Sequence, residues 1–236
     1  MLSRGRYRAR FAAGAADVAA AQGLRHLCFR GGAGRDEDRF DAACAHVLVE
    51  DVDGGRLVGC FRLQALTGEG ISDSYAGQVY DLSRLAGFPG PMVELGRFCI
   101  HPDARDADIL RVAWGALTRH VDAHRIALLF GCASFRGTDP APYRDSLALL
   151  AAGHLAPERW RPGVKAAEVV RFAGWGGADR RAGLAGMPPL LRTYLAMGGW
   201  VSDHAVVDRE MGTLHVFTGV EIGRVPERRA RALRAL

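Results

Sequence analysis

The sequence contains a single lysine, Lys165, no two cysteines in a Cys-x-x-Cys arrangement, and no long apolar run. Its five cysteines are an odd number without that spacing, which argues against a disulfide framework and a zinc ribbon. The longest nearly apolar run, residues 126–135, has about half the length that a membrane-spanning helix needs. The chain also lacks the Gly-x-Ser-x-Gly motif and the P-loop. These absences predict a cytoplasmic protein, either soluble or peripherally attached to the inner face of the cytoplasmic membrane.

Basic charge is concentrated at the two ends of the chain. Residues 1–40 carry eight Arg and four acidic residues, and residues 222–236 carry five Arg and one Glu. Each end therefore has a net charge of +4, and the overall charge of +5 leaves the middle at about −3. Basic ends predict an anionic partner, which is membrane phospholipid, nucleic acid or an acidic protein. The charge pattern does not distinguish these three.

Hydrophobic periodicity predicts an alternation of strands and helices. Strands are expected where apolar residues alternate or run continuously, and helices where they recur every three or four residues. Asp53-Gly54-Gly55 is typical of a hairpin turn, so the strands on either side of it should be antiparallel. The predicted strands cover residues 7–11, 46–50, 57–66, 92–100, 126–134 and 168–172, with a hairpin-like region at 205–220. The predicted helices cover residues 18–28, 78–85, 109–121, 142–152 and 188–197.

This order of elements predicts an α/β (α+β) fold with a mixed central sheet flanked by helices. The order is compatible with the GNAT-like acyltransferase fold, although many α+β domains share it. Residues 1–222 have no linker-like segment and are expected to form one domain. Residues 223–236 are a basic C-terminal tail, in which a short helix would place Leu233 and Leu236 on one side. A disordered, solvated tail is the alternative.

Two charged residues interrupt the apolar strand predicted for residues 92–100. Glu94 and Arg97 are three residues apart, so on a regular strand their side chains point to opposite faces. Gly96 lies between them and marks a position where a bulge would redirect one of them. A buried charge is costly unless it is paired or used in chemistry. The pattern is consistent with catalysis and equally with a structural ion pair.

Four segments in the first half of the chain resemble, in order and spacing, the signature of acyl-homoserine lactone synthases and their GNAT-like relatives. They are Leu24-Arg25-xxx-Phe29, residues 36–41, residues 60–63 and residues 94–98. The resemblance implies an acyl-transfer site surrounded by Arg25, Phe29, Asp38, Asp41, Arg62, Glu94 and Arg97. The chain departs from the lactone synthases because it has no tryptophan between Phe29 and Asp38. A lactone synthase that uses S-adenosylmethionine is therefore kept as an alternative.

The C-terminal part is similar to a second family. Residues 187–200, 205–208 and 212–217 look like the ornithine Nα-acyltransferases that begin bacterial ornithine-lipid synthesis, so the two resemblances together span nearly the whole chain. This resemblance implies transfer of a fatty acyl group, 3-hydroxylated by family analogy, from acyl carrier protein to the α-amine of L-ornithine. The product would be lyso-ornithine lipid. It also implies an anionic membrane surface as a partner and no bound cofactor, because the donor brings its own acyl-4'-phosphopantetheine.

The chemistry of amide formation suggests roles for residues in the fourth matching segment. Forming an amide from a thioester requires a neutral amine, a polarised carbonyl and an acceptor for the ammonium proton. Glu94 is the candidate base, because burial in a strand favours a carboxylate that takes up a proton. Backbone N–H groups near Phe98, freed where the strand bulges or splays, are the candidate donors to the thioester oxygen.

The remaining charged residues suit the two charged groups of an amino-acid acceptor. Arg62 and Arg97 are predicted to bind its carboxylate, and Asp38 or Asp41 its distal ammonium. The alternative for both aspartates is that they simply pair with arginines of the same cluster.

The connection at residues 101–108 bears on the acyl donor. Acetyl-CoA enzymes of this fold hold the pyrophosphate on a glycine-rich loop at a helix N-terminus. Here the connection contains three acidic residues and no glycine, so it would repel a pyrophosphate. This favours acyl carrier protein over CoA as the donor.

Two other interpretations are weaker. His120 and His124 have a metal-ligand spacing, but Val121 occupies the glutamate position of the His-Glu-x-x-His motif. We therefore expect these histidines to cap a helix and no metal to be bound. A non-catalytic nucleic-acid-binding protein is the alternative from another class, but the basic ends have few interleaved aromatic residues. No nucleic-acid partner is expected.

Overall fold

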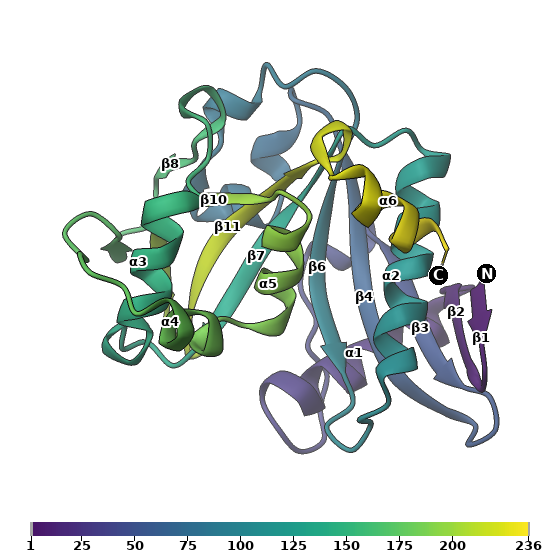
Figure 1. Ribbon diagram of the computed structural model, residues 1–236. Helices are drawn as coiled ribbons and strands as arrows, with labels where there is room; N and C mark the ends of the chain where they lie inside the picture. The colour runs from purple at the N-terminus through teal and green to yellow at the C-terminus, as the bar shows by residue number, and fades with distance from the viewer. Residues whose placement is uncertain (1, 236) are drawn as a thin grey trace. The chain divides into compact units, whose positions relative to one another are not determined.

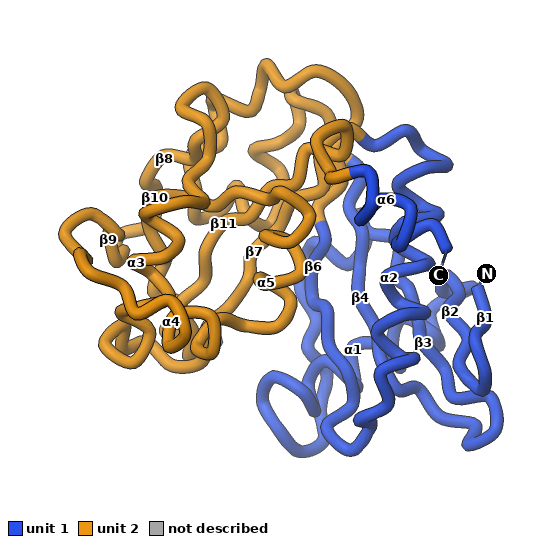
Figure 2. The backbone as a smooth tube through the Cα atoms, in the orientation of Figure 1, with its two compact units in different colours: residues 1–65, 95–126, 227–236 blue, residues 66–94, 127–226 orange. Residues whose placement is uncertain are grey.

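The computed structural model describes residues 2–235, and Figure 1 shows their helices and strands. The chain forms two compact units (Figure 2). Unit 1 comprises residues 1–65, 95–126 and 227–236, and unit 2 comprises residues 66–94 and 127–226. Strand β6 (Met92–Ile100) contributes residues 92–94 to unit 2 and residues 95–100 to unit 1.

Unit 1 contains the N-terminal strands and, among its described residues, three α-helices and one 3-10 helix. Its strands follow the order β1-β2-β3-β4-β6, with β1 (Leu2–Arg4), β2 (Tyr7–Phe11), β3 (Ala45–Asp51) and β4 (Arg56–Leu66). Its helices are α1 (Ala15–Phe29), α2 (Ala107–Ala123), α6 (Glu227–Arg234) and the 3-10 helix η1 (Asp41–Ala43). The predicted hairpin is confirmed, because β3 and β4 pair antiparallel. Asp106 accepts a hydrogen bond from the Asp108 N–H at 2.9 Å and so caps the N-terminus of α2.

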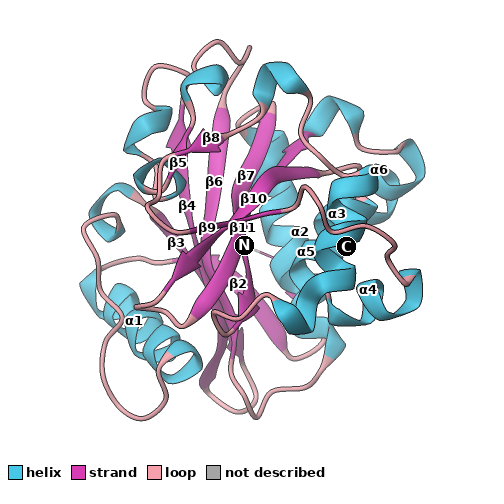
Figure 3. Ribbon diagram, turned by 90° about the vertical axis from the view of Figure 1, so that its left-hand side faces the viewer, coloured by secondary structure: helices cyan, strands magenta, loops and turns pink. Residues whose placement is uncertain are grey.

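Helices α1 and α2 cover opposite faces of the strands in unit 1 (Figure 3). Successive residues of a strand point to opposite faces, and β4 shows this directly. Cys60 packs with Leu24 of α1. The ring of the next residue, Phe61, stacks instead on the Phe98 ring, with 5.5 Å between the ring centroids. Phe98 in turn lies 6.5 Å from Trp114 of α2. The alternation therefore assigns even-numbered residues of β4 to the α1 face.

Unit 2 contains the other strands. The order is β6-β7-β11-β10-β9, with β7 (Leu128–Arg136), β9 (Val169–Arg171), β10 (Trp200–Asp208) and β11 (Thr213–Glu221). Strands β6 and β7 pair parallel and the other neighbours antiparallel, which confirms a mixed sheet. A second, two-stranded sheet joins β5 (Tyr80–Asp81) to β8 (Gly163–Val164). The helices are α3 (Arg144–Gly153), α4 (Arg180–Gly186) and α5 (Pro189–Ala196), and the 3-10 helices are η2 (Ile71–Asp73), η3 (Ala76–Gln78), η4 (Ser83–Leu85), η5 (Ala141–Tyr143), η6 (Glu158–Trp160) and η7 (Ile222–Arg224).

The helix predicted for residues 78–85 is wrong. The segment forms the end of η3, strand β5 and the 3-10 helix η4. Tyr80, Leu82 and Leu85 are all buried in the core of unit 2, and this burial holds the backbone in short turns. Tertiary packing has overridden a local periodicity here. Several short elements were not predicted, among them β1, which has only three residues, β8, which has two, and the Gly- and Arg-rich α4, which has little apolar periodicity.

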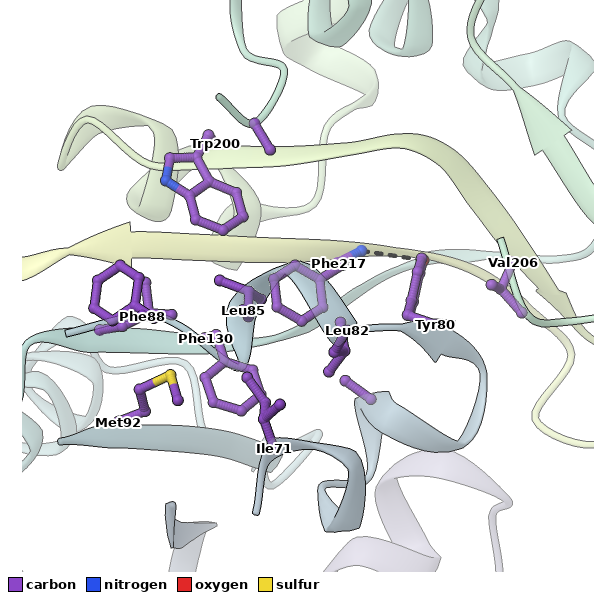
Figure 4. Packing of buried hydrophobic residues seen from close by; sticks show 13 residues of the cluster. Ile71, Tyr80, Leu82, Leu85, Phe88, Met92, Phe130, Trp200, Val206 and Phe217 are labelled. Carbon is purple, nitrogen blue, oxygen red and sulfur yellow. Dashed lines mark hydrogen bonds between the residues drawn. The ribbon is translucent and has the colours of Figure 1, made fainter. Parts of the chain in front are cut away.

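Aromatic rings fill the core of unit 2 (Figure 4). Phe217 of β11 lies 5.5 Å from Phe130 and 5.9 Å from Trp200, measured between ring centroids. The Tyr80 hydroxyl donates to the His215 carbonyl at 2.7 Å and accepts from the Phe217 N–H at 3.1 Å. The single polar atom of this buried ring is thus satisfied, and it ties the segment before β6 to β11.

Two histidines lie beside Tyr80 in the same core. His204 and His215 are 0% and 3% exposed, and their rings lie 5.1 and 5.9 Å from the Tyr80 ring. Among the described residues, His215 Nδ1 has no hydrogen-bond partner. Burial lowers the pKa of His215 to about 4, because the charged imidazolium is poorly solvated there.

His215 should therefore make the protein sensitive to mild acid. The folded state keeps the ring neutral, while the unfolded chain takes up a proton below its ordinary pKa near 6.5, so stability is lost as the pH falls from about 6.5 to 4. The loss amounts to about 3 kcal/mol. Urea unfolding measured from pH 7 to pH 4 should show this dependence in the native protein and much less of it in His215→Gln. The control is His124→Gln, at the exposed C-cap of α2. An unchanged pH dependence in His215→Gln would contradict the assignment.

Candidate active site

Helix α1 presents Arg25 to a buried pair of aspartates. The Arg25 side chain is 1% exposed, and its Nε donates to Asp36 Oδ2 at 2.8 Å. Its Nη1 donates to Asp41 Oδ1 at 2.7 Å. Gln22, one turn earlier on the same face of α1, donates from Nε2 to Asp41 Oδ2 at 3.0 Å. Both oxygens of Asp41 are therefore held by α1.

Strand β4 contributes Arg62 to the same cluster. Arg62 donates two parallel hydrogen bonds to Asp38, from Nη1 to Oδ1 at 2.6 Å and from Nη2 to Oδ2 at 2.8 Å. Its Nη1 also donates to Asp41 Oδ1 at 2.6 Å. The side chain is 3% exposed, and the Phe40 ring lies 5.8 Å from its guanidinium carbon. Arg62 thereby fixes the loop that carries both aspartates against the α1 face of the strands.

Strand β6 adds Arg97 through an unusual backbone conformation. Arg97 has φ +54°, in the left-handed region that costs a non-glycine residue about 1–3 kcal/mol. Its Nε donates to Asp36 Oδ2 at 2.9 Å and its Nη2 to Asp38 Oδ2 at 3.1 Å. The sequence placed the irregular residue at Gly96, one position earlier. These bonds support the strained conformation.

The cluster is electrically balanced. Three guanidinium groups face three carboxylates, and every carboxylate contacts two of the arginines. Burial alone would raise the pKa of Asp41, but hydrogen bonds from Arg25, Gln22 and Arg62 outweigh it and hold that pKa well below its usual value. The pKa of Asp38 is also lowered, because its bond to Arg62 and the nearby charge of Arg97 overcome its burial. Asp38 and Asp41 therefore stay ionised at neutral pH.

The structure brings together most of the residues predicted from the sequence. Those that meet in the cluster are Arg25, Asp38, Asp41, Arg62 and Arg97. Asp36 and Gln22 were missed, because residues 36–41 contain four acidic side chains and no spacing selects among them. Phe29, the last residue of α1, is 36% exposed and lies outside this buried cluster.

Glu94 belongs to unit 2 and is held in a different way. Its side chain is 4% exposed; Oε2 accepts from the Tyr75 N–H and Oε1 from the Ala76 N–H, each at 2.8 Å. These donors begin η3, whose compact turn requires glycine at 77, since a Cβ there would lie 2.6 Å from the Ser72 carbonyl oxygen. Two main-chain donors stabilise the ionised carboxylate and fix its orientation. Glu94 and Arg97, the two predicted catalytic residues, thus lie in different compact units.

Phe98 lies on β6 beyond its pairing with β7. The parallel register between these strands, over the residues that the structure describes, runs from Met92–Leu128 to Glu94–Phe130. Phe98 follows four residues later, and its ring stacks on Phe61. Its main chain thus lies past the last registered pair with β7, while β4 is the neighbour of β6 on the other side.

The N-terminus of α2 is occupied by carboxylates. Asp106 caps the helix, and Asp108 Oδ1 accepts from Arg4 at 3.0 Å and from Arg111 at 2.8 Å. A pyrophosphate bound at this helix end would have to displace these groups and approach their charges. The geometry is therefore poorly suited to the pyrophosphate of CoA.

Comparison with known proteins gives matches of different extent. Residues 25–115 match the family model described as an acetyltransferase (GNAT) domain. The chain is 37% identical over 229 residues to an L-ornithine N(alpha)-acyltransferase of Rhodobacter capsulatus, covering 89% of this chain and 88% of that protein. It is 33% identical over 84 residues to an acyl-homoserine-lactone synthase of Agrobacterium fabrum, covering 34% of this chain and 39% of that protein.

A solved structure has a similar fold. FeeM, an N-acyl amino acid synthase from uncultured soil microbes, superposes with a TM-score of 0.53 at 10% sequence identity, over 92% of each chain. At this identity the likeness concerns the fold alone. It agrees with the GNAT-like arrangement predicted from the order of elements.

The buried ion cluster should carry more stability than ion pairs at the surface. Asp41→Asn keeps the side-chain shape but leaves Arg25 and Arg62 without a full counter-charge, so the free energy of unfolding should fall by about 3 kcal/mol or more. Glu168→Gln breaks an exposed pair with Arg209 and should change it far less. The free energy of unfolding of each variant is to be measured by urea unfolding at pH 7. Equal effects of the two substitutions would show that the cluster is not a stabilising core.

Proposed function

The chain belongs to the L-ornithine N(alpha)-acyltransferase family, and on that premise we propose that it transfers a fatty acyl group from acyl carrier protein to the α-amine of L-ornithine. The acyl group is proposed to be 3-hydroxylated, and the product is lyso-ornithine lipid, formed in the first step of ornithine-lipid synthesis. The observation that carries this proposal is the extent of the match, 89% of the chain at 37% identity. The similarity to a lactone synthase, by contrast, covers 34% of the chain.

The proposed reaction is acyl transfer from sulfur to nitrogen. The neutral α-amine attacks the thioester carbonyl carbon, a C–N bond forms, the C–S bond breaks, and the phosphopantetheine thiol leaves. Glu94 is proposed to accept the proton of the new ammonium, directly or through water. Its carboxylate is already oriented by two main-chain N–H groups. The Phe98 N–H is proposed as a donor to the oxygen on which negative charge develops.

The outer half of the ion cluster is proposed to bind the acceptor. Arg97 and Asp38 have side chains that are 14% and 21% exposed, whereas Arg25 and Asp41 are 1% and 7% exposed. Ornithine carries a carboxylate and a distal ammonium, and the cluster offers both signs of charge. We assign the carboxylate to Arg97, assisted by Arg62. The ammonium is assigned to Asp38, with the more deeply buried Asp41 as the second carboxylate.

The decisive experiment supplies donor and acceptor together. Purified protein is incubated with acyl carrier protein carrying a 3-hydroxyacyl chain, with and without ornithine, while free thiol and lipid product are followed. Ornithine-dependent thiol release with formation of lyso-ornithine lipid supports the proposal. Release that depends on S-adenosylmethionine instead would favour the lactone synthase. The same chain on CoA should be used far less well, given the carboxylates at the start of α2.

The role of Glu94 is tested by Glu94→Gln. Loss of a general base typically lowers turnover about 10²- to 10⁴-fold, and this loss is expected in kcat. Circular dichroism and thermal unfolding check that the variant is folded, because the amide also changes the contact with the Tyr75 N–H. A folded variant with native turnover would remove Glu94 from the mechanism.

An anionic membrane surface is proposed as the place where the amphiphilic product is released. Within residues 2–235, no helix combines the length and apolar composition needed to cross a bilayer. The C-terminal tail forms the helix α6, in which Arg231 pairs with Glu227 and Arg234 with Asp122 of α2. Leu236, expected on its apolar side, lies outside the described residues. Arg228 and Arg229 are the α6 arginines assigned to lipid contact.

Membrane contact through α6 is tested by reversing those two charges. The double variant Arg228→Glu, Arg229→Glu should co-sediment with anionic vesicles roughly tenfold less well at low salt, and the difference should shrink as salt screens it. Arg56→Glu, at the exposed first residue of β4, is the single-site control. Undiminished vesicle binding by the double variant would place the membrane contact elsewhere.

A further inference from the structure

The basic charge of the N-terminus is neutralised within unit 1. Each of the four alternating arginines has a carboxylate partner: Arg4 with Asp108, Arg6 with Asp51, Arg8 with Glu50 and Arg10 with Asp17. The N–O distances for the first and third of these pairs are 3.0 and 2.7 Å. The arginines at positions 4, 6, 8 and 10 are therefore a row of ion pairs, and this row offers little net charge to a partner.

A second group of cations, in unit 2, bonds mainly to uncharged partners. Arg84 Nη1 donates to the Glu158 carbonyl at 2.8 Å, and Lys165 Nζ to the Gly77 carbonyl at 2.6 Å. Two more cations complete this group: Arg161 donates to the Ala156 carbonyl at 3.3 Å, and the Arg159 guanidinium lies over the Trp160 ring at 5.0 Å. Neutral partners orient a cation but leave its charge in place. Arg84, Arg159, Arg161 and Lys165 are called the basic surface below.

The elements that carry the basic surface adjoin one another. Arg84 lies on η4 and bonds to the main chain of η6, which carries Arg159, and Lys165 directly follows β8. Strand β8 pairs with β5, as Figure 3 shows, and brings Lys165 to Asp81. The pKa of Asp81 is lowered by the Ser83 N–H and by the charges of Lys165 and Arg84, so both cations lie close to it. Asp81 and Glu158 are the carboxylates carried by these elements, and they leave an excess of two positive charges.

The basic surface is also connected to Glu94. Lys165 Nζ bonds to the carbonyl of Gly77, which is the middle residue of η3. The N–H groups at the start of η3 are the ones that hold both oxygens of Glu94. The chain's one lysine thus lies a single 3-10 turn from the carboxylate to which we assign proton transfer.

We propose that the basic surface is the docking site for acyl carrier protein. This inference rests on the proposed function and adds to it the surface that receives the donor. An acidic carrier complements this surface, whose four cations outnumber its two carboxylates and leave an excess of two positive charges, and charge complementarity directs such encounters. Docking here brings the phosphopantetheine arm to the end of η3, next to Glu94. The mixed arrangement around Asp81 suits a protein with defined carboxylate positions better than a uniform phosphate surface.

The test compares two charge reversals of equal size. Arg84→Glu, Arg159→Glu changes the basic surface, and Arg180→Glu, Arg181→Glu changes two exposed arginines of α4 in the same unit. The dissociation constant of holo acyl carrier protein is measured by calorimetry at low and at physiological salt. The surface variant should bind at least about tenfold more weakly, and the KM for the loaded carrier should rise by a similar factor. The α4 variant should bind like the native protein.

Because binding is measured without acyl transfer, this test is independent of the proposed reaction. If the native protein fails to acylate ornithine but binds the carrier through this surface, the reaction is wrong and the docking site stands. Arg159→Glu alone removes no hydrogen bond to the main chain and is the variant to use if the double variant unfolds. Native affinity in the folded surface variants, or equal weakening in the α4 variant, overturns the proposal. So does loss of binding to anionic vesicles or RNA with carrier binding unchanged.

Discussion

The buried ion cluster of Arg25, Arg62 and Arg97 with Asp36, Asp38 and Asp41 is the constraint on which unit 1 depends. Removing so many charges from water costs several kcal/mol for each ion unless its partners are complete. Every ion has its full set of partners only when α1, the loop at residues 36–41, β4 and β6 are all in their native positions. The left-handed conformation of Arg97 is explained in the same way, since two carboxylates hold its guanidinium where a regular strand would not put it.

The proposed chemistry uses two kinds of preorganisation. The charged side chains that are assigned to bind the acceptor are each paired with side chains of opposite charge. This pairing makes their geometry specific but keeps their net electric field small. Glu94 is held by main-chain donors of η3, which favour its ionised form. Since these donors belong to a compact turn that also contacts Lys165, the position of the carboxylate and that of the proposed carrier-binding surface are set by the same few residues.

Charge in the sequence and charge on the surface are distributed differently. Residues 1–40 have a net charge of +4, yet the arginines at positions 4, 6, 8 and 10 each meet an acid from β3, α1 or α2. The middle of the chain is acidic overall, yet it carries the cations of the basic surface. The ion pairs responsible join residues such as Arg6 and Asp51, which are 45 positions apart. The net charge summed over a segment of the sequence does not reveal a partner that lies so far away in the chain.

The sequence by itself determined the class of fold, the positions of most strands and helices, and the set of residues from which a site would be built. Alternation and helical spacing are local properties, and the apolar strand interrupted by Glu94 and Arg97 is visible without a structure. Only the tertiary structure decided that residues 78–85 form short turns, that Arg97 is the strained residue, and that Asp36 joins the cluster. Each of these depends on burial and on charges brought together from distant parts of the chain, because the free energy of a buried charge is set by its neighbours in space.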